Sequence, residues 1–265
     1  MIIDFHTHIF PDKIAEKTIE VLSNAASLPP HTDGTLAGLR RSMSESGIDY
    51  SVVLPIATKP SQAATINSFS AEITGKGGII SFGSIHPFSD NWKAELDNVS
   101  ALGLKGIKLH PEYQGFFIDD EKIYPVIEYA KKLGLIVIFH SGVDLGFTCE
   151  VRCTPERIRK MLDKIGGGRL VFAHGGGFQC WKEVSEYLAG QDIYFDLSFT
   201  KGSLTDEKLL RLIRIHGVEK WLFGTDSPWS SQFEYVNAIK SLKLNDDELF
   251  RIMYKNAPEL LNMGE

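Results

Sequence analysis

Short runs of β-branched and aromatic residues alternate with longer amphipathic stretches along the whole chain, and this alternation limits the fold more than any other feature. The pattern is typical of βαβ units, in which helices join parallel strands. The predicted strand ends are about 31 residues apart on average, close to the ~30 residues of one βαβ unit. We predict eight strands, at residues 2–6, 50–55, 78–85, 104–110, 135–140, 170–174, 193–198 and 221–226.

Amphipathic segments occupy the intervals and predict helices at residues 36–45, 61–75, 91–102, 121–133, 155–165, 181–188, 205–216 and 234–242, with a last helix over 246–261. Thr154 can cap the helix that begins at Pro155, and Asp246 can cap the last helix. Residues 24–33 form a long first connection that we expect to cover the barrel mouth.

Eight units of this length predict an α/β fold, a single (β/α)8 TIM barrel over residues 1–265 with a C-terminal helix. An open doubly wound sheet uses the same alternation. Its first strand, however, is normally followed by a glycine-rich phosphate turn, and here a His-Thr-His segment stands in that place. We therefore favour the closed barrel.

Composition and charge narrow the functional classes. Hydrophobic residues make up 43% of the chain and charged residues 23%, as in ordinary globular proteins. The net charge is -6 without a basic run, which argues against nucleic acid as a partner. The N-terminus lacks a secretory pattern, and no segment reaches the ~18 apolar residues of a membrane span. We expect a cytoplasmic protein that acts on a small molecule without binding a membrane.

The three cysteines, Cys149, Cys153 and Cys180, are too few and odd in number for a disulfide framework. Free thiols are the simplest interpretation. A metal or redox pair across the Cys-x3-Cys spacing of the first two is the alternative.

Polar residues that end strands are informative, because barrel enzymes carry their reacting groups at the carboxyl ends of the strands. Two of the eight histidines, His31 and His216, fall in a loop and a helix, and we interpret them as structural or solvated. The other histidines and one aspartate end or follow predicted strands: His6, His8, His86, His110, His140, His174 and Asp226.

His6 and His8 point the same way because side chains alternate along a strand. Together with His140 and Asp226 they offer three nitrogens and one oxygen, a set that suits zinc, with manganese, iron or cobalt as alternatives. We predict one divalent ion, zinc, on these four residues. Each histidine alone could be a hydrogen-bonded core residue and Asp226 could cap a turn, but their joint placement favours a metal site.

His174 lies beyond this ligand set and is predicted to be a nearby acid or base, with a core histidine as the alternative. Lys108 shares strand parity with His110 and should point into the barrel, where an unpaired charge is costly. Two interpretations stay open for it: a buried salt bridge with Asp4, which we prefer, and a carboxylated lysine that bridges two metal ions. His110 then faces the substrate.

Two further residues are candidates for substrate binding. Arg152, in the loop after the fifth strand, could bind a substrate carboxylate, although a surface position is an equal alternative. Trp229 follows the eighth strand, and exposed aromatic residues of this kind also leave room for a homodimer.

Five motifs spread over nearly the whole chain occur in the order of one known family: DFHTH at 4–8, GIKLHP at 106–111, FHSG at 139–142, AHGG at 173–176 and FGTDSPW at 223–229. With them the chain resembles the amidohydrolase superfamily, in the amidohydrolase-related branch that includes aminocarboxymuconate-semialdehyde decarboxylase. The resemblance implies a distorted barrel, a mononuclear metal on His6, His8, His140 and Asp226, and His174 as a catalytic histidine.

From the metal-activated water that such a site provides, we predict a hydrolase acting on an amide, lactone or ester bond of a small, carboxylated substrate. Asp226 and His174 would then transfer protons. The alternatives are a metal-dependent non-oxidative decarboxylase and a catalytically inactive metal- or ligand-binding barrel. The chain is shorter than the decarboxylases of the branch, which weighs toward hydrolysis.

Overall fold

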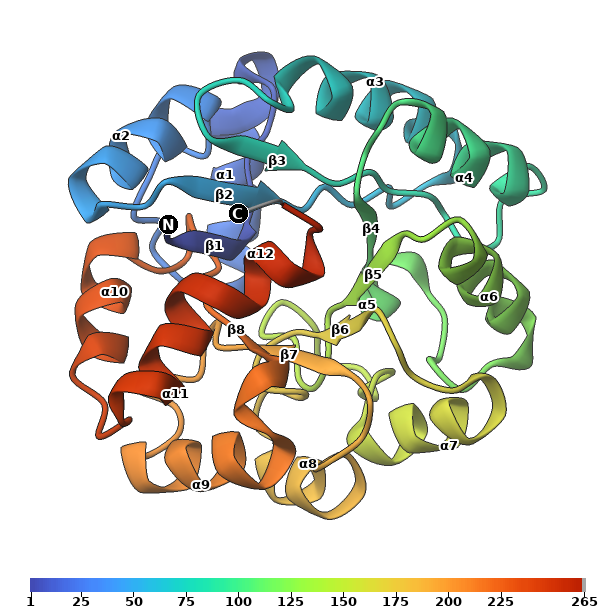
Figure 1. Ribbon diagram of the computed structural model, residues 1–265. Helices are drawn as coiled ribbons and strands as arrows, with labels where there is room; N and C mark the ends of the chain where they lie inside the picture. Colours follow the sequence, from blue (N-terminus) through green and yellow to red (C-terminus); the bar gives the residue numbers. More distant parts are fainter. Residues whose placement is uncertain (264–265) are drawn as a thin grey trace.

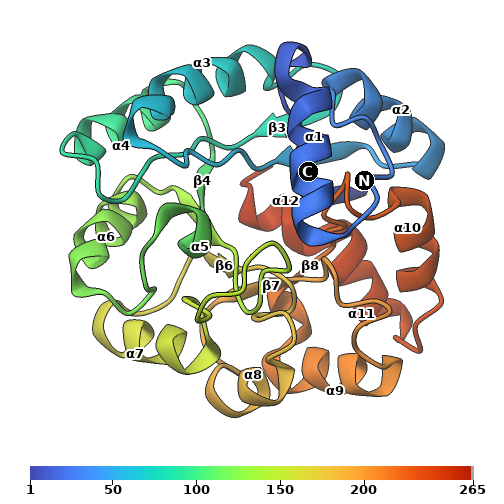
Figure 2. The same cartoon turned by 180° about the vertical axis from the view of Figure 1, so that it is seen from behind.

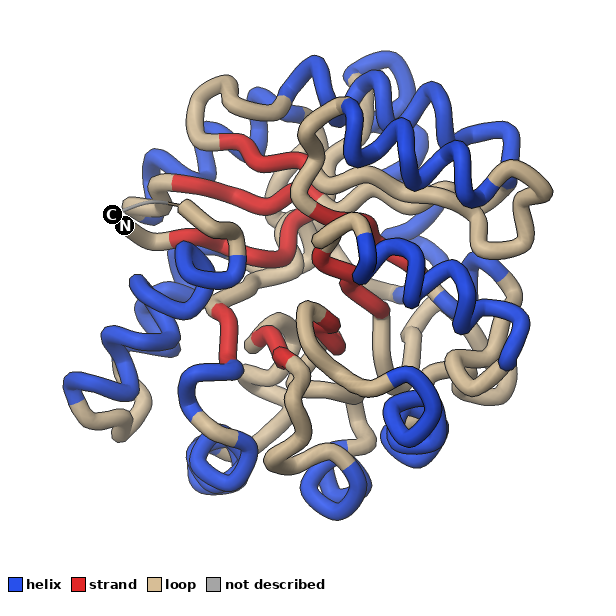
Figure 3. The backbone as a smooth tube through the Cα atoms, turned by 45° about the vertical axis from the view of Figure 1, so that its right-hand side comes forward, coloured by secondary structure: helices blue, strands red, loops and turns tan. Residues whose placement is uncertain are grey.

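The computed structural model describes residues 1–263 and shows a ring of short parallel strands surrounded by helices (Figures 1 and 3). The strands come in the predicted order and positions; β1 is as long as predicted, and the others are shorter than the apolar runs that encode them. They are β1 (Ile3–Thr7), β2 (Tyr50–Val53), β3 (Ile79–Ser81), β4 (Gly106–Leu109), β5 (Ile136–Phe139), β6 (Leu170–Phe172), β7 (Tyr194–Asp196) and β8 (Trp221–Leu222).

The ring consists of two arcs, β1-β2-β3 and β4-β5-β6-β7-β8, in which every pairing is parallel. Backbone hydrogen bonds join the arcs at both seams. Gly83 N donates to Gly106 O at 2.8 Å at one seam, and Phe5 N donates to Phe223 O at 2.8 Å at the other. The predicted barrel is therefore confirmed, and the open doubly wound sheet is excluded.

Helices form the outer layer and match the predicted ones to within a few residues. They are α2 (Leu36–Ser46), α3 (Ala63–Ile73), α4 (Trp92–Ala101), α6 (Tyr124–Lys132), α7 (Pro155–Ile165), α8 (Trp181–Tyr187), α9 (Asp206–His216), α10 (Gln232–Lys240), α11 (Asp246–Phe250) and α12 (Asn256–Leu260). The last two are joined without a break by a π-helical segment, Arg251–Lys255, so the single helix predicted there is present with a π-helical middle.

Two α-helices were not predicted, α1 (Asp12–Ala26) and the short α5 (Pro111–Gln114). Neither belongs to the repeating strand and helix units. Figure 2 shows α1 lying in front of the barrel on the side opposite to α12. An extra helix in a strand-to-helix connection interrupts the regular spacing on which the prediction relied.

The two predicted helix caps had different outcomes. The Thr154 side chain accepts a hydrogen bond from Arg157 N at 3.3 Å, as predicted. The prediction for Asp246 is wrong, because this residue is already the first of its helix. The cap is Asn245, whose side chain accepts from Glu248 N at 2.9 Å while the Glu248 carboxylate accepts from Asn245 N at 2.9 Å. This reciprocal pair satisfies two backbone donors at once.

The amino-terminal end of the barrel is filled by apolar side chains. Leu260 and Leu261 at the end of α12 belong to the same buried cluster as Phe5 and Phe82 inside the ring, and α12 crosses this end in Figure 1. The polar residues of the interior are therefore left to the opposite, carboxyl end.

The three cysteines are free thiols, as expected. No helix within residues 1–263 has both the length and the apolar character of a membrane span.

Candidate metal centre

A cavity of about 600 Å³ opens at the carboxyl end of the barrel. Of the six histidines predicted at strand ends, His86 is absent from its lining; its Nδ1 instead accepts a hydrogen bond from Phe88 N at 3.3 Å. The remaining predicted residues that line the cavity are His6, His8, Lys108, His110, His140, His174, Asp226 and Trp229.

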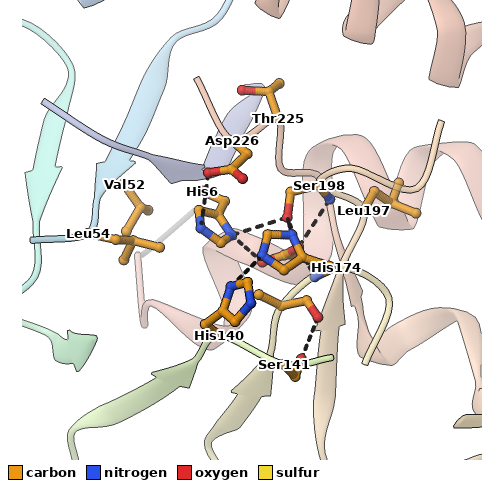
Figure 4. A network of polar contacts seen from close by, with 12 residues as sticks. His6, Val52, Leu54, His140, Ser141, His174, Leu197, Ser198, Thr225 and Asp226 are labelled. Atoms are coloured by element: carbon orange, nitrogen blue, oxygen red, sulfur yellow. Dashed lines mark hydrogen bonds and ion pairs between the residues drawn. The ribbon is translucent and has the colours of Figure 1, made fainter. Parts of the chain in front are cut away.

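His6, His8 and Asp226 converge on one point. The Nε2 atoms of the two rings are 3.2 Å apart, and Asp226 Oδ1 lies 3.5 Å from Nε2 of His6 and 3.1 Å from Nε2 of His8. Figure 4 shows the Asp226 carboxylate beside the His6 ring. The structure thus brings together three of the four predicted metal ligands.

The hydrogen bonds on the far side of each ring determine which nitrogen carries the proton. His6 Nδ1 donates to Asp196 Oδ2 at 2.7 Å, and His8 Nδ1 donates to Leu54 O at 2.8 Å. Both Nε2 atoms are therefore unprotonated and direct lone pairs toward Asp226 Oδ1, which is buried and accepts no hydrogen bond within residues 1–263. Three acceptors facing one another fit a divalent cation between them.

The position of His140 differs from that of the other three predicted ligands. Its Nε2 is buried and has no hydrogen-bond partner in the described part of the chain. It lies 3.8 Å from Asp144 Oδ2, and the ring stacks on His110 with centroids 4.2 Å apart. His140 thus falls with His110 and Asp144 into a second group of potential ligands next to the first. Its coordination of the same ion as His6 stays a prediction.

His174 links the two groups through hydrogen bonds. His174 Nε2 lies 3.1 Å from His140 Nδ1, and His174 Nδ1 lies 2.8 Å from the Ser198 hydroxyl, which donates in turn to Asp196 (Figure 4). Asp196 therefore ends the chain of contacts that starts at His140 and also holds His6. These contacts orient both rings.

Asp196 and Ser198 were missed in the sequence, although a signal for one of them existed. Asp196 lies at the carboxyl end of β7, where the rule that selected the histidines also applies. Asp144 was missed as well, and it lies in the loop that follows β5, where no strand pattern marks it.

Two residues of the site have backbone conformations that side chains rarely adopt. His174 has φ of 60° and Asp226 has φ of 68°, both in the left-handed region. Such conformations are uncommon outside glycine and concentrate at functional sites, where the surrounding structure maintains them.

Burial and neighbouring groups shift the acidity of the site. Burial alone would raise the pKa of Asp226, but the facing His6 and His8 rings hold it well below its ordinary value. Burial lowers the pKa of His174 to about 4. Burial and the adjacent histidines also hold the pKa of His140 well below its usual range. The His140 and His174 rings are therefore neutral and the Asp226 carboxylate is ionised at neutral pH, as metal binding requires.

The predicted Lys108–Asp4 salt bridge is wrong. Asp4 instead accepts hydrogen bonds from Thr225 Oγ1 at 2.6 Å and Gln232 Nε2 at 2.7 Å, so its carboxylate has partners without a cation. Lys108 Nζ lies 3.4 Å from His6 Nε2 and lines the cavity. Burial lowers the pKa of Lys108 to about 8, opposed by nearby carboxylates, so its ammonium form still predominates at neutral pH.

Of the three predicted substrate-binding residues, two line the cavity and one does not. His110 lines the cavity, with Nε2 3.2 Å from Asp144 Oδ2, and Trp229 lines it as well. Arg152 is not brought to the cavity lining. Its guanidinium lies over the Phe117 ring, 4.9 Å from the centroid, because the loop that carries it pairs with the connection after α5, where Ile118 N donates to Arg152 O at 3.1 Å.

A family model described as amidohydrolase matches residues 3–263. The chain belongs to the amidohydrolase family. Among curated proteins, 2-amino-3-carboxymuconate-6-semialdehyde decarboxylase of Dictyostelium discoideum is 26% identical over 159 residues, with 48% of this chain and 44% of that protein covered. The matched region therefore spans less than half of that relative's length.

Solved structures of two decarboxylases share the fold. 5-Carboxyvanillate decarboxylase of Sphingomonas paucimobilis has a TM-score of 0.74 at 15% identity, with 99% of each chain covered. A dihydroxybenzoic acid decarboxylase of Polaromonas, with bound manganese and the inhibitor 2-nitroresorcinol, has a TM-score of 0.74 at 15% identity, covering 100% of this chain and 97% of that one.

These relatives correct the expected reaction. The chain is an enzyme of the amidohydrolase superfamily, but the prediction of a hydrolase is wrong, since the curated relative and both solved structures named above are decarboxylases. The error has a chemical reason: a divalent cation can activate water or polarise a substrate oxygen with the same ligands. The ligand motifs alone therefore cannot distinguish the two reactions.

Proposed function

We propose that this amidohydrolase-family enzyme is a metal-dependent non-oxidative decarboxylase that acts on an aromatic carboxylic acid. The observation that carries this proposal is the position of the His6, His8 and Asp226 cluster at the floor of a cavity with apolar walls. The names of the curated relative and of the solved neighbours support the same reaction.

The walls matter because decarboxylation converts a localised carboxylate charge into neutral carbon dioxide. An apolar environment removes water from the carboxylate and favours the transition state, in which that charge is dispersed into the ring. The apolar residues that line the cavity include Ile9, Phe10, Val53, Leu54, Ile56, Val143, Phe178, Phe199 and Trp229.

We assign His6, His8, His140 and Asp226 to a divalent cation. When bound, the cation supplies positive charge that holds the substrate's oxygens and withdraws electron density from the bond that breaks. Zinc fits the nitrogen and oxygen donors, and manganese is present in the Polaromonas structure. His174, through its contact with His140 Nδ1, orients that ring.

Lys108 and Asp226 have separate roles in this proposal. The Lys108 ammonium group on the cavity floor binds the substrate carboxylate. As the carbon–carbon bond breaks, its electron pair stays on the ring carbon and carbon dioxide leaves. Solvent supplies the replacing proton, which Asp226, ionised at rest, relays to the ring carbon from its place in the cavity lining.

The experiment that tests the proposal measures carbon dioxide and ring product together. Protein reconstituted with manganese or zinc is incubated with 2,6-dihydroxybenzoate and 5-carboxyvanillate. We expect equimolar carbon dioxide and decarboxylated phenol, which an Asp226→Asn variant does not form. A metal-loaded protein that releases no carbon dioxide from any hydroxylated aromatic acid, while the Polaromonas enzyme does so in the same assay, would contradict it.

A further inference from the structure

The cavity extends beyond the candidate metal centre along two helices. α1 contributes Ile14, Thr18, Leu22 and Ala26, which are spaced by four residues and so lie on one helix face. We call the part of the cavity that α1 and α3 line the annex. Figure 2 shows α1 in front of the barrel end, with α3 at the rim. α3 contributes Thr65, Ile66, Phe69 and Ser70.

The annex has no counter-ion for an anion. Within residues 1–263 the cavity lining contains no arginine, and Lys108, beside His6 on the floor, is its one lysine. The polar residues that α1 and α3 contribute are neutral hydroxyl side chains. A second carboxylate placed there would lose its water without gaining a partner, which is strongly unfavourable.

The size and the rim of the cavity point to a ligand with a large apolar part. A volume of about 600 Å³ lies in the middle of the range of about 300–1,000 Å³ that is usual for drug-sized ligands. At the rim, the residues Ile14 and Leu145 are 51% and 41% exposed. An apolar group in the annex would remove part of this surface from water.

We propose that the annex binds an apolar substituent, an alkyl chain or a second ring, on a substrate that carries a single carboxylate. This inference rests on the proposed decarboxylase function, because it places that carboxylate at Lys108 and the metal ligands. It specifies a monoanionic aromatic acid with an apolar tail and excludes dicarboxylates whose second acid group would lie in the annex.

Calorimetric binding to the manganese-loaded protein tests the annex without requiring turnover. The probes are 2,6-dihydroxybenzoates that carry hydrogen, methyl, propyl or pentyl opposite the carboxylate, and one whose chain ends in a second carboxylate. We expect the dissociation constant to fall about fourfold for each methylene, as burial of a CH₂ group predicts, and the dicarboxylate to bind no better than the unsubstituted acid. A dissociation constant that does not change with chain length would overturn the proposal.

Neighbouring residues of α1 provide a matched pair of variants. Leu22 lines the cavity, whereas its neighbour Val21 is absent from the lining and 56% exposed. We expect Leu22→Asp to abolish the dependence on chain length while the unsubstituted acid still binds, and Val21→Asp to preserve it. If Leu22→Asp does not fold, Leu22→Ala should reduce the gain per methylene; an undiminished gain would count against the annex.

The outcomes separate this inference from the proposed function. Affinity that rises with chain length without any release of carbon dioxide would uphold the annex and contradict the decarboxylase. Release of carbon dioxide with equal affinity across the series would uphold the decarboxylase and contradict the annex.

Discussion

Asp196 accepts a hydrogen bond from His6 Nδ1 at 2.7 Å across 190 positions of sequence. The same carboxylate accepts the Ser198 hydroxyl, which contacts His174. One buried aspartate therefore fixes the proton position on His6 and anchors the contacts that lead to His140. Partners of this kind orient metal ligands and raise their basicity.

We predict that Asp196→Asn lowers metal affinity about 10- to 100-fold, because the amide removes the negative charge that favours the Nδ1–H form of His6. Competition with a chromogenic chelator measures the change. The control is Asp192→Asn, which breaks a surface ion pair with Lys220 and should leave the affinity unchanged. Equal affinity in both variants would show that Asp196 does not support the site.

His110 and His140 stack on each other, but we expect only His140 to hold the ion. His140→Ala should lower metal affinity by more than about 100-fold, since it removes a ligand itself. His110→Ala should keep one ion per chain. Elemental analysis after dialysis compares the two. Loss of the ion in both variants would instead assign it to the group that His110 and His140 form with Asp144.

Removal of the Lys108 charge should weaken substrate binding. We predict that Lys108→Met raises KM about 30-fold with a smaller effect on kcat, because the substrate carboxylate is left without its buried partner. Steady-state kinetics with a hydroxylated aromatic acid measure both constants. Lys105→Met, at an exposed position nearby, is the control. An unchanged KM in Lys108→Met would remove this residue from substrate binding.

His216, away from the site, should make stability depend on pH. Burial lowers its pKa to about 4, and its ring stacks on Phe195 with centroids 4.0 Å apart. In the unfolded chain His216 has a pKa near 6.5, so between pH 4 and pH 6.5 the unfolded chain binds a proton that the folded chain does not. The neutral, buried His216 therefore contributes to the free energy of unfolding above pH 6.5, and this contribution is lost as the pH falls toward 4.

Urea unfolding at pH 7.5 and pH 4.5 tests this prediction. The loss of unfolding free energy on acidification should be smaller in His216→Gln than in the wild type by up to about 3 kcal/mol, the equivalent of the His216 shift. The glutamine amide can still donate to Ile193 O, to which His216 Nε2 donates at 3.0 Å. An identical pH dependence in the two proteins would contradict the assignment.

Much of the fold and the region of the site followed from the sequence alone. The alternation of apolar runs and amphipathic stretches predicted eight parallel strands, and their carboxyl ends predicted where His6, His8 and Asp226 meet. These features are readable because strand parity and helical period are local properties, and because a parallel barrel brings all its strand ends to one rim.

The tertiary structure determined the side-chain contacts that the local sequence pattern could not predict. In the folded chain, Asp196 accepts a hydrogen bond from His6, and Asp4 accepts one from Thr225 instead of pairing with Lys108. Arg152 lies away from the cavity. The tertiary structure also added α1, whose inner face helps to make the cavity apolar. The partner of a buried polar group depends on which distant side chains approach it in the folded chain. Spacing along the sequence predicts where a side chain lies, whereas its hydrogen bonds and ion pairs arise only when separate segments pack together.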